Sequence, residues 1–314
     1  MSHASVNGGS LGHPFAGMLW MAAASALFAA MNVFARLASA SLPWPEVAAA
    51  RTVVAVLVAV SVAYARRAPL TVRDRPMAWA RSLAGTASML CVFYALGAPQ
   101  IALGDVVTLG SITPIFIALL SPWLLGERSG RAVWIATLVA TAGVALVAGP
   151  QLRIAGHLAV IATLGSFCSA LAMIFLRKLR VGPADAARPG ESPEAIVVHF
   201  SVVSSVAMLA LTVPVWRAPD ARGAALLLGT GLSGGLAQLA MTRAYALDRA
   251  ARLGTVGYLG VVLSHLFGAI VLGERPGPSQ ALGTLLVIVA GLMLGLVALR
   301  DARLADRRAA SAGG

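Results

Sequence analysis

The chain has 314 residues, of which 59% are hydrophobic and only 11% are charged. Soluble domains have about 25% charged residues, so this chain lacks the polar surface that a soluble enzyme, a disordered protein or a fibrous repeat requires. The net charge of +12 does not indicate nucleic-acid binding, because the basic residues, nearly all arginine, lie in short segments between apolar runs.

Ten apolar runs are long enough to cross a bilayer, which takes about 20 residues. Residues 1–12 are small, polar and rich in Gly and Ser, so we expect a disordered N-terminus without a cleaved signal peptide. The predicted spans are 15–35, 45–65, 77–97, 104–125, 132–150, 155–176, 195–215, 223–242, 251–272 and 279–299. Residues 300–314 form a basic cytoplasmic tail. The expected fold class is therefore an all-α integral membrane protein with ten transmembrane helices.

The distribution of basic residues predicts the orientation. With the N-terminus in the cytoplasm, the inside loops hold 17 Lys and Arg residues and the outside loops hold 5, while Arg51 and Arg81 lie within spans. Cytoplasmic loops carry an excess of Lys and Arg, so both termini are expected in the cytoplasm. The use of arginine in place of lysine, and the absence of eukaryotic retrieval signals, favour a bacterial inner membrane.

All twelve Asp and Glu residues lie at or beyond the ends of the spans. A carboxylate at mid-membrane would mark an ion or proton pathway, so proton coupling through Asp or Glu is not expected. Cys91 and Cys168 have neither metal-ligand nor disulfide-framework spacing and are expected to be buried thiols. We therefore expect no metal and no cofactor.

The two halves of the chain share motifs in the same order. Tyr-Ala-Leu precedes a span that ends Leu-Gly-Glu-Arg, at 94–96 and 125–128 and again at 245–247 and 272–275. Because five spans are an odd number, a second copy enters the membrane from the opposite side. The sequence thus predicts two inverted five-helix repeats, the architecture of many secondary transporters, whose substrate site lies near the midplane between the halves.

Pro45-Glu46 with Arg51 five residues on starts the second span, as Pro193-Glu194 with His199 starts the seventh. Together with the ten spans and the Gly-Glu ends of the fourth and ninth spans, this pattern resembles the EamA-type branch of the drug/metabolite transporter superfamily. The resemblance covers about 13–299 and implies repeats over 13–150 and 151–299. It also implies an inner-membrane carrier whose cavity is lined mainly by spans one, three, four, six, eight and nine.

The first two spans offer the first candidate substrate-binding residues. Ser25, Phe28, Asn32 and Arg36 share one helix face, where Asn32 either binds substrate beside Phe28 or makes a helix–helix hydrogen bond. Arg51, inside the second span, either meets a carboxylate or phosphate or forms a structural pair. His199 holds the matching place in the second half and has the same alternatives.

The second half adds further candidates. His265 is the histidine well inside the ninth span and shares a face with Tyr258; because histidine titrates near neutral pH, it is the candidate for proton coupling or substrate contact, unless it is a packing residue. Gln238 lies on a polar face of the eighth span with Thr242 and Tyr245. Gly231 and Gly235 on the same span are expected to allow close helix packing.

Pro114 lies near the middle of the fourth span and removes one helical hydrogen bond, which frees the carbonyl of Gly110. Ser111 and Thr113 are placed to satisfy that region. The proline is either a hinge beside the substrate, with Ser111 as a ligand, or a passive kink. Tyr94 is an aromatic candidate for stacking on a planar solute, although aromatic residues at helical spacing more often pack.

The chain has no Walker motif, HExxH motif or nucleophile elbow, so neither an ATP-driven pump nor an enzyme is expected. The sequence favours a secondary transporter of a small organic metabolite, amino-acid-like or otherwise zwitterionic or anionic, as a monomer or homodimer in the lipid bilayer. An exporter of drugs or of aromatic, flavin-like or nucleoside-like solutes is the alternative. A membrane scaffold or enzyme without transport activity is the alternative of another class.

Overall fold

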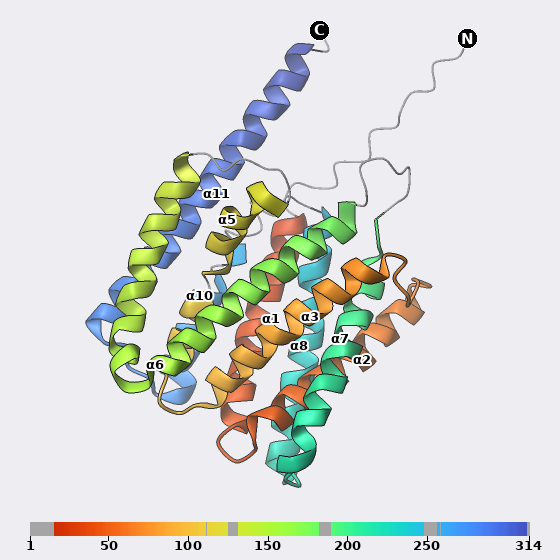
Figure 1. Cartoon of the computed structure of the whole chain (residues 1–314), viewed down its shortest axis with the longest axis vertical. Coiled ribbons are helices and arrows are strands. Elements are labelled where there is room, and N and C mark those ends of the chain that lie inside the picture. Colours follow the sequence, from red (N-terminus) through yellow and green to blue (C-terminus); the bar gives the residue numbers. More distant parts are fainter. Residues whose placement is uncertain are drawn as a thin grey trace.

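The computed structural model describes residues 16–110, 112–124, 131–181, 190–247, 256–257 and 259–312, and the regular structure in these ranges is entirely helical. The short 3-10 helix η1 (Val213–Val215) follows α7. The helices are α1 (Ala16–Ala38), α2 (Trp44–Ala65), α3 (Arg75–Gly97), α4 (Leu103–Gly110), α5 (Thr113–Leu124), α6 (Arg131–Val181), α7 (Pro193–Thr212), α8 (Ala221–Leu247), α10 (Leu259–Leu272) and α11 (Pro278–Ala312). They form one bundle (Figure 1).

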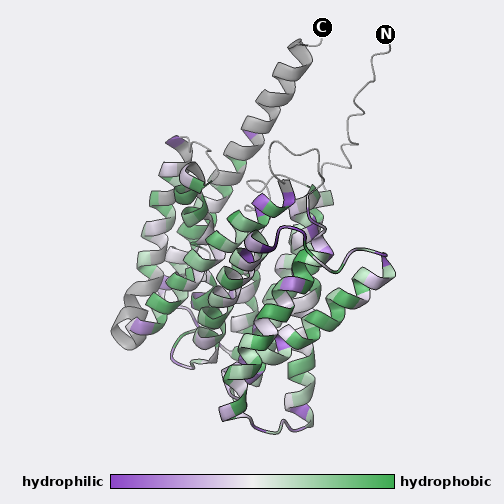
Figure 2. Ribbon diagram, turned by 45° about the vertical axis from the view of Figure 1, so that its right-hand side comes forward, coloured by the Kyte–Doolittle hydropathy of each residue, from purple (hydrophilic) through white to green (hydrophobic). Residues whose placement is uncertain are grey.

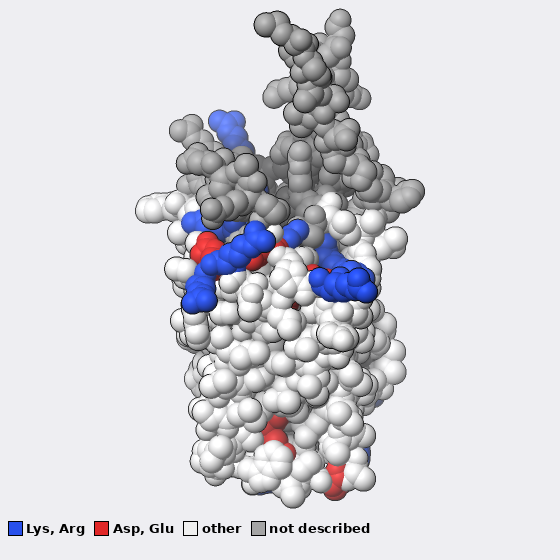
Figure 3. All heavy atoms as spheres, turned by 90° about the vertical axis from the view of Figure 1, so that its right-hand side faces the viewer, with Lys and Arg blue, Asp and Glu red and all other residues white. Residues whose placement is uncertain are grey.

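Five of these helical segments are long and apolar enough to cross a membrane, and four shorter apolar helices accompany them in the described part of the chain. The five are Ala16–Ala38, Trp44–Ala65, Gly156–Arg180, Pro193–Val215 and Ala221–Tyr245. Hydrophobic residues cover much of the ribbon in Figure 2. Figure 3 shows one face on which Lys and Arg gather near one end, next to a broad band without charged side chains. The protein is a multi-pass membrane protein.

The fifth and sixth predicted spans lie in one helix, α6, of 51 residues. A straight helix of this length would be about 77 Å long, but Figure 1 shows α6 folded back so that its two arms lie beside different helices. A methyl group at Gly143 of the first arm would lie 2.6 Å from the Gly283 carbonyl oxygen of α11, and one at Gly165 of the second arm would lie 2.9 Å from the Cys91 Cβ of α3. Pro150, in the segment between the two predicted spans, lacks the backbone N–H that a helix uses at that position.

The fourth predicted span is interrupted. Helix α4 ends at Gly110 and α5 begins at Thr113, one residue before Pro114. The Thr113 Oγ1 donates to the Gly110 carbonyl at 2.8 Å, as the sequence predicted for the carbonyl that Pro114 leaves without a helical partner. Ser111 lies outside the described residues, as does the side chain of Pro114. A break therefore exists at the predicted depth, and its role as a hinge stays a prediction.

Two further expectations need adjustment. Helix α11 continues to Ala312, through most of the segment predicted as a separate basic tail. Cys91 and Cys168 are free thiols as expected, but both are half-buried instead of buried. The residues 1–12 predicted as disordered lie outside the described part of the chain.

Helices α2 and α7 begin at opposite ends of the bundle. The Glu46 Oε2 in the first turn of α2 accepts from the backbone N–H of Arg217, in the segment between α7 and α8. Glu194 in the first turn of α7 instead lies 3.9 Å from Arg66, just after α2. We call these the Glu46 end and the Glu194 end. The Ser192 hydroxyl caps α7 by accepting from the Ala195 N–H at 3.1 Å, and Pro193 follows it at the first helical position.

Glycine allows the closest helix contacts, as the sequence predicted for α8. A methyl group at Gly231 would lie 2.4 Å from the Cβ of Val54, and one at Gly235 would lie 3.1 Å from the Cα of Ala55. Small residues let helix backbones approach in a membrane, where van der Waals packing replaces the hydrophobic effect as the main attraction. Helices α2 and α8 are thereby held against each other beside the site described next.

Candidate functional site

Two buried arginines share one aromatic ring near the centre of the bundle. Arg51 of α2 is 4% exposed and Arg81 of α3 is 2% exposed. The guanidinium carbons lie 5.8 Å (Arg51) and 4.0 Å (Arg81) from the ring centroid of Phe200 on α7. Arg51 is about 10 Å along α2 from the Glu46 end, and Arg81 is about 10 Å along α3 from the Glu194 end. The two cations thus approach the ring from opposite ends of the bundle.

The hydrogen-bonding needs of these guanidinium groups are largely unmet. The Arg51 Nη1 donates to the Met89 Sδ at 3.0 Å, and a thioether is a weak acceptor. Within the described ranges, the buried Nε of Arg51 and the Nε and Nη1 of Arg81 have no hydrogen-bond partner. Among the described residues neither arginine forms an ion pair, and Arg81 makes its closest favourable contact with the Phe200 ring.

Two glycines make room for this arrangement. A methyl group at Gly85 of α3 would lie 2.8 Å from the Phe200 Cε2 and 3.2 Å from the Arg81 Nη1. A methyl group at Gly234 of α8 would lie 2.8 Å from the Met31 Sδ and 3.2 Å from the Arg51 Nε. Any side chain at either position would move an arginine or the ring, so the sequence keeps this space for the two cations.

Further buried donors lie on α7 and α8, two helices that pack against α2. The hydroxyls of Ser201 and Ser205 and the Nε2 of Gln238 are buried and have no hydrogen-bond partner among the described residues. Ser201 follows Phe200 in α7, and Ser205 lies one turn further on the same face. Gln238 is one turn after Gly234, on the face of α8 that meets Arg51. We define the arginine site as Arg51, Arg81, Phe200, Ser201, Ser205 and Gln238.

The neighbouring polar groups are satisfied. Thr86 and Ser204 share a hydrogen bond of 2.8 Å between their hydroxyl oxygens. The Ser82 hydroxyl lies 2.8 Å from the Nδ1 of His199, whose ring also packs edge-on against Trp79 at 5.2 Å. His199, the counterpart of Arg51 in the second half, thus has partners on α3. Within the part of the chain that the structure describes, the Nε of Arg180 and the hydroxyl of Ser264 are further buried donors without a partner, but the arginine site holds most of them.

The structure brings together only some of the predicted site residues. Arg51 and Gln238 belong to the arginine site. Asn32 is 9% exposed, on the helix that packs along α8. Phe28 on the same face packs against a core cluster that includes Ala240 and Met241 of α8. These four residues lie on three helices that contact one another, α1, α2 and α8.

Other predicted residues lie elsewhere. Tyr94 is 36% exposed and packs edge-on against Trp44. The Nε2 of His265 on α10 lies 3.0 Å from the hydroxyls of both Thr108 on α4 and Thr284 on α11. His265 therefore joins three helices in a polar cluster of its own. Tyr258 lies outside the described residues.

The residues that sequence reasoning missed are Arg81, Phe200 and the serines of α7. A signal existed for each. Arg81 is a charge inside an apolar run, as Arg51 is. Ser201, Ser204 and Ser205 recur at spacings of three and four in α7, which places hydroxyls on one helix face. Neither signal says that α2, α3 and α7 meet at one point.

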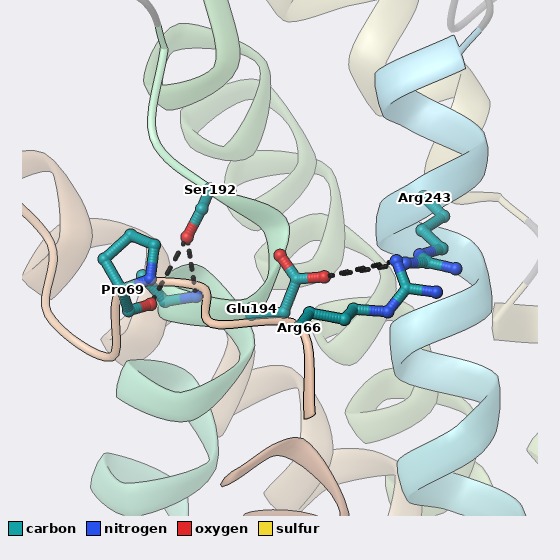
Figure 4. Close-up of polar contacts among 6 residues, drawn as sticks. Arg66, Pro69, Ser192, Glu194 and Arg243 are labelled. Carbon is teal, nitrogen blue, oxygen red and sulfur yellow. Dashed lines mark hydrogen bonds and ion pairs between the residues drawn. The ribbon is translucent and has the colours of Figure 1, made fainter. Parts of the chain in front are cut away.

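A second charged cluster lies at the Glu194 end (Figure 4). The Glu194 Oε1 is 3.6 Å from Arg243 on α8 and 3.9 Å from Arg66, and Arg243 also lies over the ring of Trp20 on α1 at 5.2 Å. The Ser192 hydroxyl lies 3.5 Å from the carbonyl of Pro69. We call Arg66, Glu194 and Arg243 the Glu194 cluster. It connects the ends of α2, α7 and α8 on one side of the arginine site.

The opposite end is joined differently. The Arg36 guanidinium donates to the carbonyls of Leu96, Ala98 and Ile101 at 2.8, 2.5 and 2.6 Å, so it binds α1 to the end of α3. The Glu274 Oε1 accepts from the backbone N–H of Leu103 at 2.8 Å. Arg36, which shares a face with Asn32 in sequence, is thus a structural residue.

The sequence profile of the EamA-like transporter family matches residues 15–149 and again residues 156–296. The pseudopaline exporter CntI of Pseudomonas aeruginosa is 29% identical over 280 residues, 88% of this chain and 95% of its own length. The riboflavin transporter of Vibrio cholerae is 26% identical over 282 residues, 88% and 92% of the two chains.

One crystal structure of a protein that is 19% identical to this chain superposes with a TM-score of 0.63. The match includes 88% of this chain and 98% of the other, so the two proteins share a fold. The S-adenosylmethionine uptake transporter of Rickettsia prowazekii is 22% identical over 181 residues. The relatives are transporters, and the family profile covers both halves of the described bundle. The chain belongs to the EamA-like transporter family.

Proposed function

We propose that this protein is a secondary transporter, not driven by ATP, that moves a small organic metabolite with a negatively charged group by alternating access. The solute is amino-acid-like or another zwitterionic or anionic molecule. The observation that carries the proposal is the pair of buried arginines, Arg51 and Arg81, whose N–H groups lack an anionic partner among the described residues.

The free energy of burial supports this reading. Removing an ion from water carries an effective penalty of several kcal/mol even after the protein relaxes, unless a partner of opposite charge compensates. Two such ions around one ring add mutual repulsion to that penalty. Intramembrane charges that persist at this cost are usually functional, and guanidinium groups match carboxylate and phosphate oxygens in pairs. An anionic solute supplies the missing partner.

Ten spans in two inverted repeats, 13–150 and 151–299, are part of the proposal. Three observations support it: the family profile matches twice, α2 and α7 begin at opposite ends, and helix contacts come in matched pairs. Helix α1 packs on α8 as α3 packs on the second arm of α6, while α2 packs on α7 and α4 packs on α10. If each helix of the first half is replaced by its counterpart in the second half, and the reverse, the same helix pairs are in contact.

Labelling from one side of the membrane tests the inversion. Single cysteines replace Ser129, which lies outside the described residues, and Pro278 at the start of α11, in a chain without Cys91 and Cys168. An impermeant thiol reagent should label Ser129→Cys from the cytoplasmic side and Pro278→Cys from the other. Labelling of both from the same side would contradict the inverted repeats and the cytoplasmic termini in a bacterial inner membrane.

Transport by purified protein in liposomes tests the function. Arg51→Gln should lower the uptake of anionic and zwitterionic metabolites by about tenfold or more, because a hydrogen bond to a charged group contributes about 1.5–3 kcal/mol. Arg222→Gln, which removes an exposed arginine at the start of α8, is the matched control and should leave uptake unchanged. An equal loss for neutral and charged solutes would give Arg51 a structural role, and no flux of any solute would favour a scaffold or an enzyme.

A second candidate substrate class is aromatic, flavin-like or nucleoside-like, with transport in the export direction. Riboflavin transporters of Vibrio cholerae and Rhizobium johnstonii are 26% and 25% identical to this chain, and CntI is named an exporter. Riboflavin therefore belongs in the liposome panel, loaded on either side of the membrane. Faster flux of riboflavin than of small anions would favour this class.

His265 stays the candidate for proton coupling. Thr108 and Thr284 both contact its Nε2, so a change of its charge would alter the contacts among α4, α10 and α11. His265→Gln keeps a hydrogen-bonding side chain but cannot titrate near neutral pH. Uptake by this variant should lose its pH dependence between about pH 5 and 8. An unchanged pH profile with full activity would make His265 a packing residue.

A further inference from the structure

The unmet groups of the arginine site have one chemical character. The atoms without partners are the Nε of Arg51, the Nε and Nη1 of Arg81, the Nε2 of Gln238 and the hydroxyls of Ser201 and Ser205. The nitrogen atoms can only donate, and a hydroxyl donates as readily as it accepts. These unmet atoms therefore offer a ligand a set of donors, and none of them is an acceptor alone.

No carboxylate of the described residues reaches this set. Glu46 lies in the first turn of α2 and accepts from Arg217, and Glu194 is paired with Arg66 and Arg243 at the other end. Asp105 accepts from the side chain of Gln280 at 2.7 Å. The ammonium group of an amino acid would thus be buried beside two cations without a carboxylate, which like-charge repulsion and desolvation both oppose.

The charge of the site also sets the charge of the ligand. Arg51 and Arg81 are both cationic, because a guanidinium does not lose its proton in proteins. A monoanion neutralises one of them and leaves the other buried without a partner. A ligand with two negative charges neutralises both. Because both guanidinium groups contact the Phe200 ring, such a ligand would bind beside that ring.

We infer that the arginine site selects a solute with two negative charges on oxyanion groups, a dicarboxylate or a phosphate ester, over monoanions and zwitterions. The inference rests on the proposed function and narrows its substrate class. Gln238 on α8 and Ser201 and Ser205 on α7, two helices that pack against α2, supply the additional donors that a second carboxylate or a phosphate would accept from. They are therefore expected to set the strength of binding and not its charge preference.

A matched set of four-carbon ligands tests the charge. Succinate carries two negative charges, butyrate one, and 4-aminobutyrate one of each sign; inorganic phosphate and glycerol phosphate distinguish a phosphate from a dicarboxylate site. Binding to the full-length purified protein is followed by ligand-induced thermal stabilisation, since a ligand bound only by the folded state raises its stability. We expect succinate or a phosphate to bind roughly ten- to hundredfold more tightly than butyrate and 4-aminobutyrate. The dianions make one more hydrogen-bonded contact with a charged group than the other two ligands do.

Charge variants separate this selectivity from the packing of the site. Arg81→Gln and Arg51→Gln leave one cation each and should bring the affinities for succinate and butyrate within about threefold, since one charged contact is lost. Arg81→Lys keeps both charges and should retain the preference for the dianion with weaker binding, because ammonium does not reproduce the bidentate geometry. Ser205→Ala should weaken all anions alike.

The outcomes are distinct. If butyrate or 4-aminobutyrate binds as tightly as the dianions in the unaltered protein, the two-charge inference is wrong and transport of a singly charged solute stands. If the Arg→Gln variants fold, as shown by their melting transitions, and keep the preference for succinate, the inference is also wrong. If none of these anions binds and none is transported, the anionic substrate class of the proposed function fails with it.

Discussion

Arg81→Met should make the protein more stable and inactive. Methionine is close in length, packs against the Phe200 ring through its sulfur, and removes a buried cation that has no ion-pair partner among the described residues. Replacing buried ionic groups by apolar residues of similar volume is neutral or stabilising by about 1–4 kcal/mol. The same change removes half of the positive charge of the site, so the preference for dianions and the transport of the native solute should be lost.

Thermal unfolding of the purified protein and uptake into liposomes measure the two effects. Arg36→Met is the matched control. The Arg36 guanidinium donates to three backbone carbonyls, so its removal should destabilise the folded protein. We expect Arg36→Met to lower the melting temperature and Arg81→Met to raise it. A fall in melting temperature for Arg81→Met as large as that for Arg36→Met would show that Arg81 is a structural residue.

Glu194→Gln should open the Glu194 end. Glu194 is 6% exposed and holds Arg243 of α8 and Arg66 after α2 to the start of α7. The contact with half-exposed Arg66 contributes little, whereas the one with Arg243 is less exposed and loses its charge pairing in the variant. A loss of about 1–2 kcal/mol changes a two-state population roughly five- to thirtyfold, so access to the arginine site from this end should rise by that factor.

The labelling rate of a cysteine in the site measures this access. Ser201→Cys, in a chain without Cys91 and Cys168, reacts with an impermeant thiol reagent added on one side at a time. Glu194→Gln should speed the reaction from the Glu194 side alone. Glu191→Gln is the control, because Glu191 accepts from the backbone N–H groups of Arg73 and Asp74 and not from the Glu194 cluster. An unchanged rate in Glu194→Gln would remove the cluster from the gating of the site.

If the cluster closes one end, its state should also depend on the ligand. Glu194 and the arginine site share α7 and α8, since Arg243 is nine residues from Gly234 along α8 and Glu194 is six residues from Phe200 along α7. Alternating access requires that such an end contact break when the other end closes. Glu46, whose Oε1 is buried and has no hydrogen-bond partner in the part of the chain that the structure describes, is placed to take the corresponding role at its own end.

Most of the helices could be predicted from composition and run length alone. Spans predicted at 15–35, 45–65 and 195–215 correspond closely to α1, α2 and α7, because in lipid every backbone group must be satisfied within its own helix. Sequence features accompany the departures: Pro114 follows the interruption between α4 and α5, and Pro150 lies between the two predicted spans that α6 joins. What run length did not predict is that α6 remains helical through that turn.

The site was predicted only in part. Arg51 was recognisable because a charge within an apolar run is rare, and the same reasoning applied to Arg81 but was not used. His265 drew attention as a lone titratable group, yet its threonine partners come from α4 and α11 and could not be foreseen from α10. Tyr94 illustrates the converse: an aromatic in the right span packs on Trp44 and is partly exposed.

The amino-acid sequence alone determined that this is a helical membrane protein with basic and apolar segments in alternation, because hydropathy is a local property summed over about 20 residues. Only the tertiary structure decided that Arg51 and Arg81 meet at Phe200 while Arg66 and Arg243 meet at Glu194. The partner of a buried charge comes from another helix, and the glycines that let helices approach set which side chains face one another. These helix contacts leave Arg51 and Arg81 without an ion-pair partner among the described residues, whereas Arg66 and Arg243 are paired with Glu194.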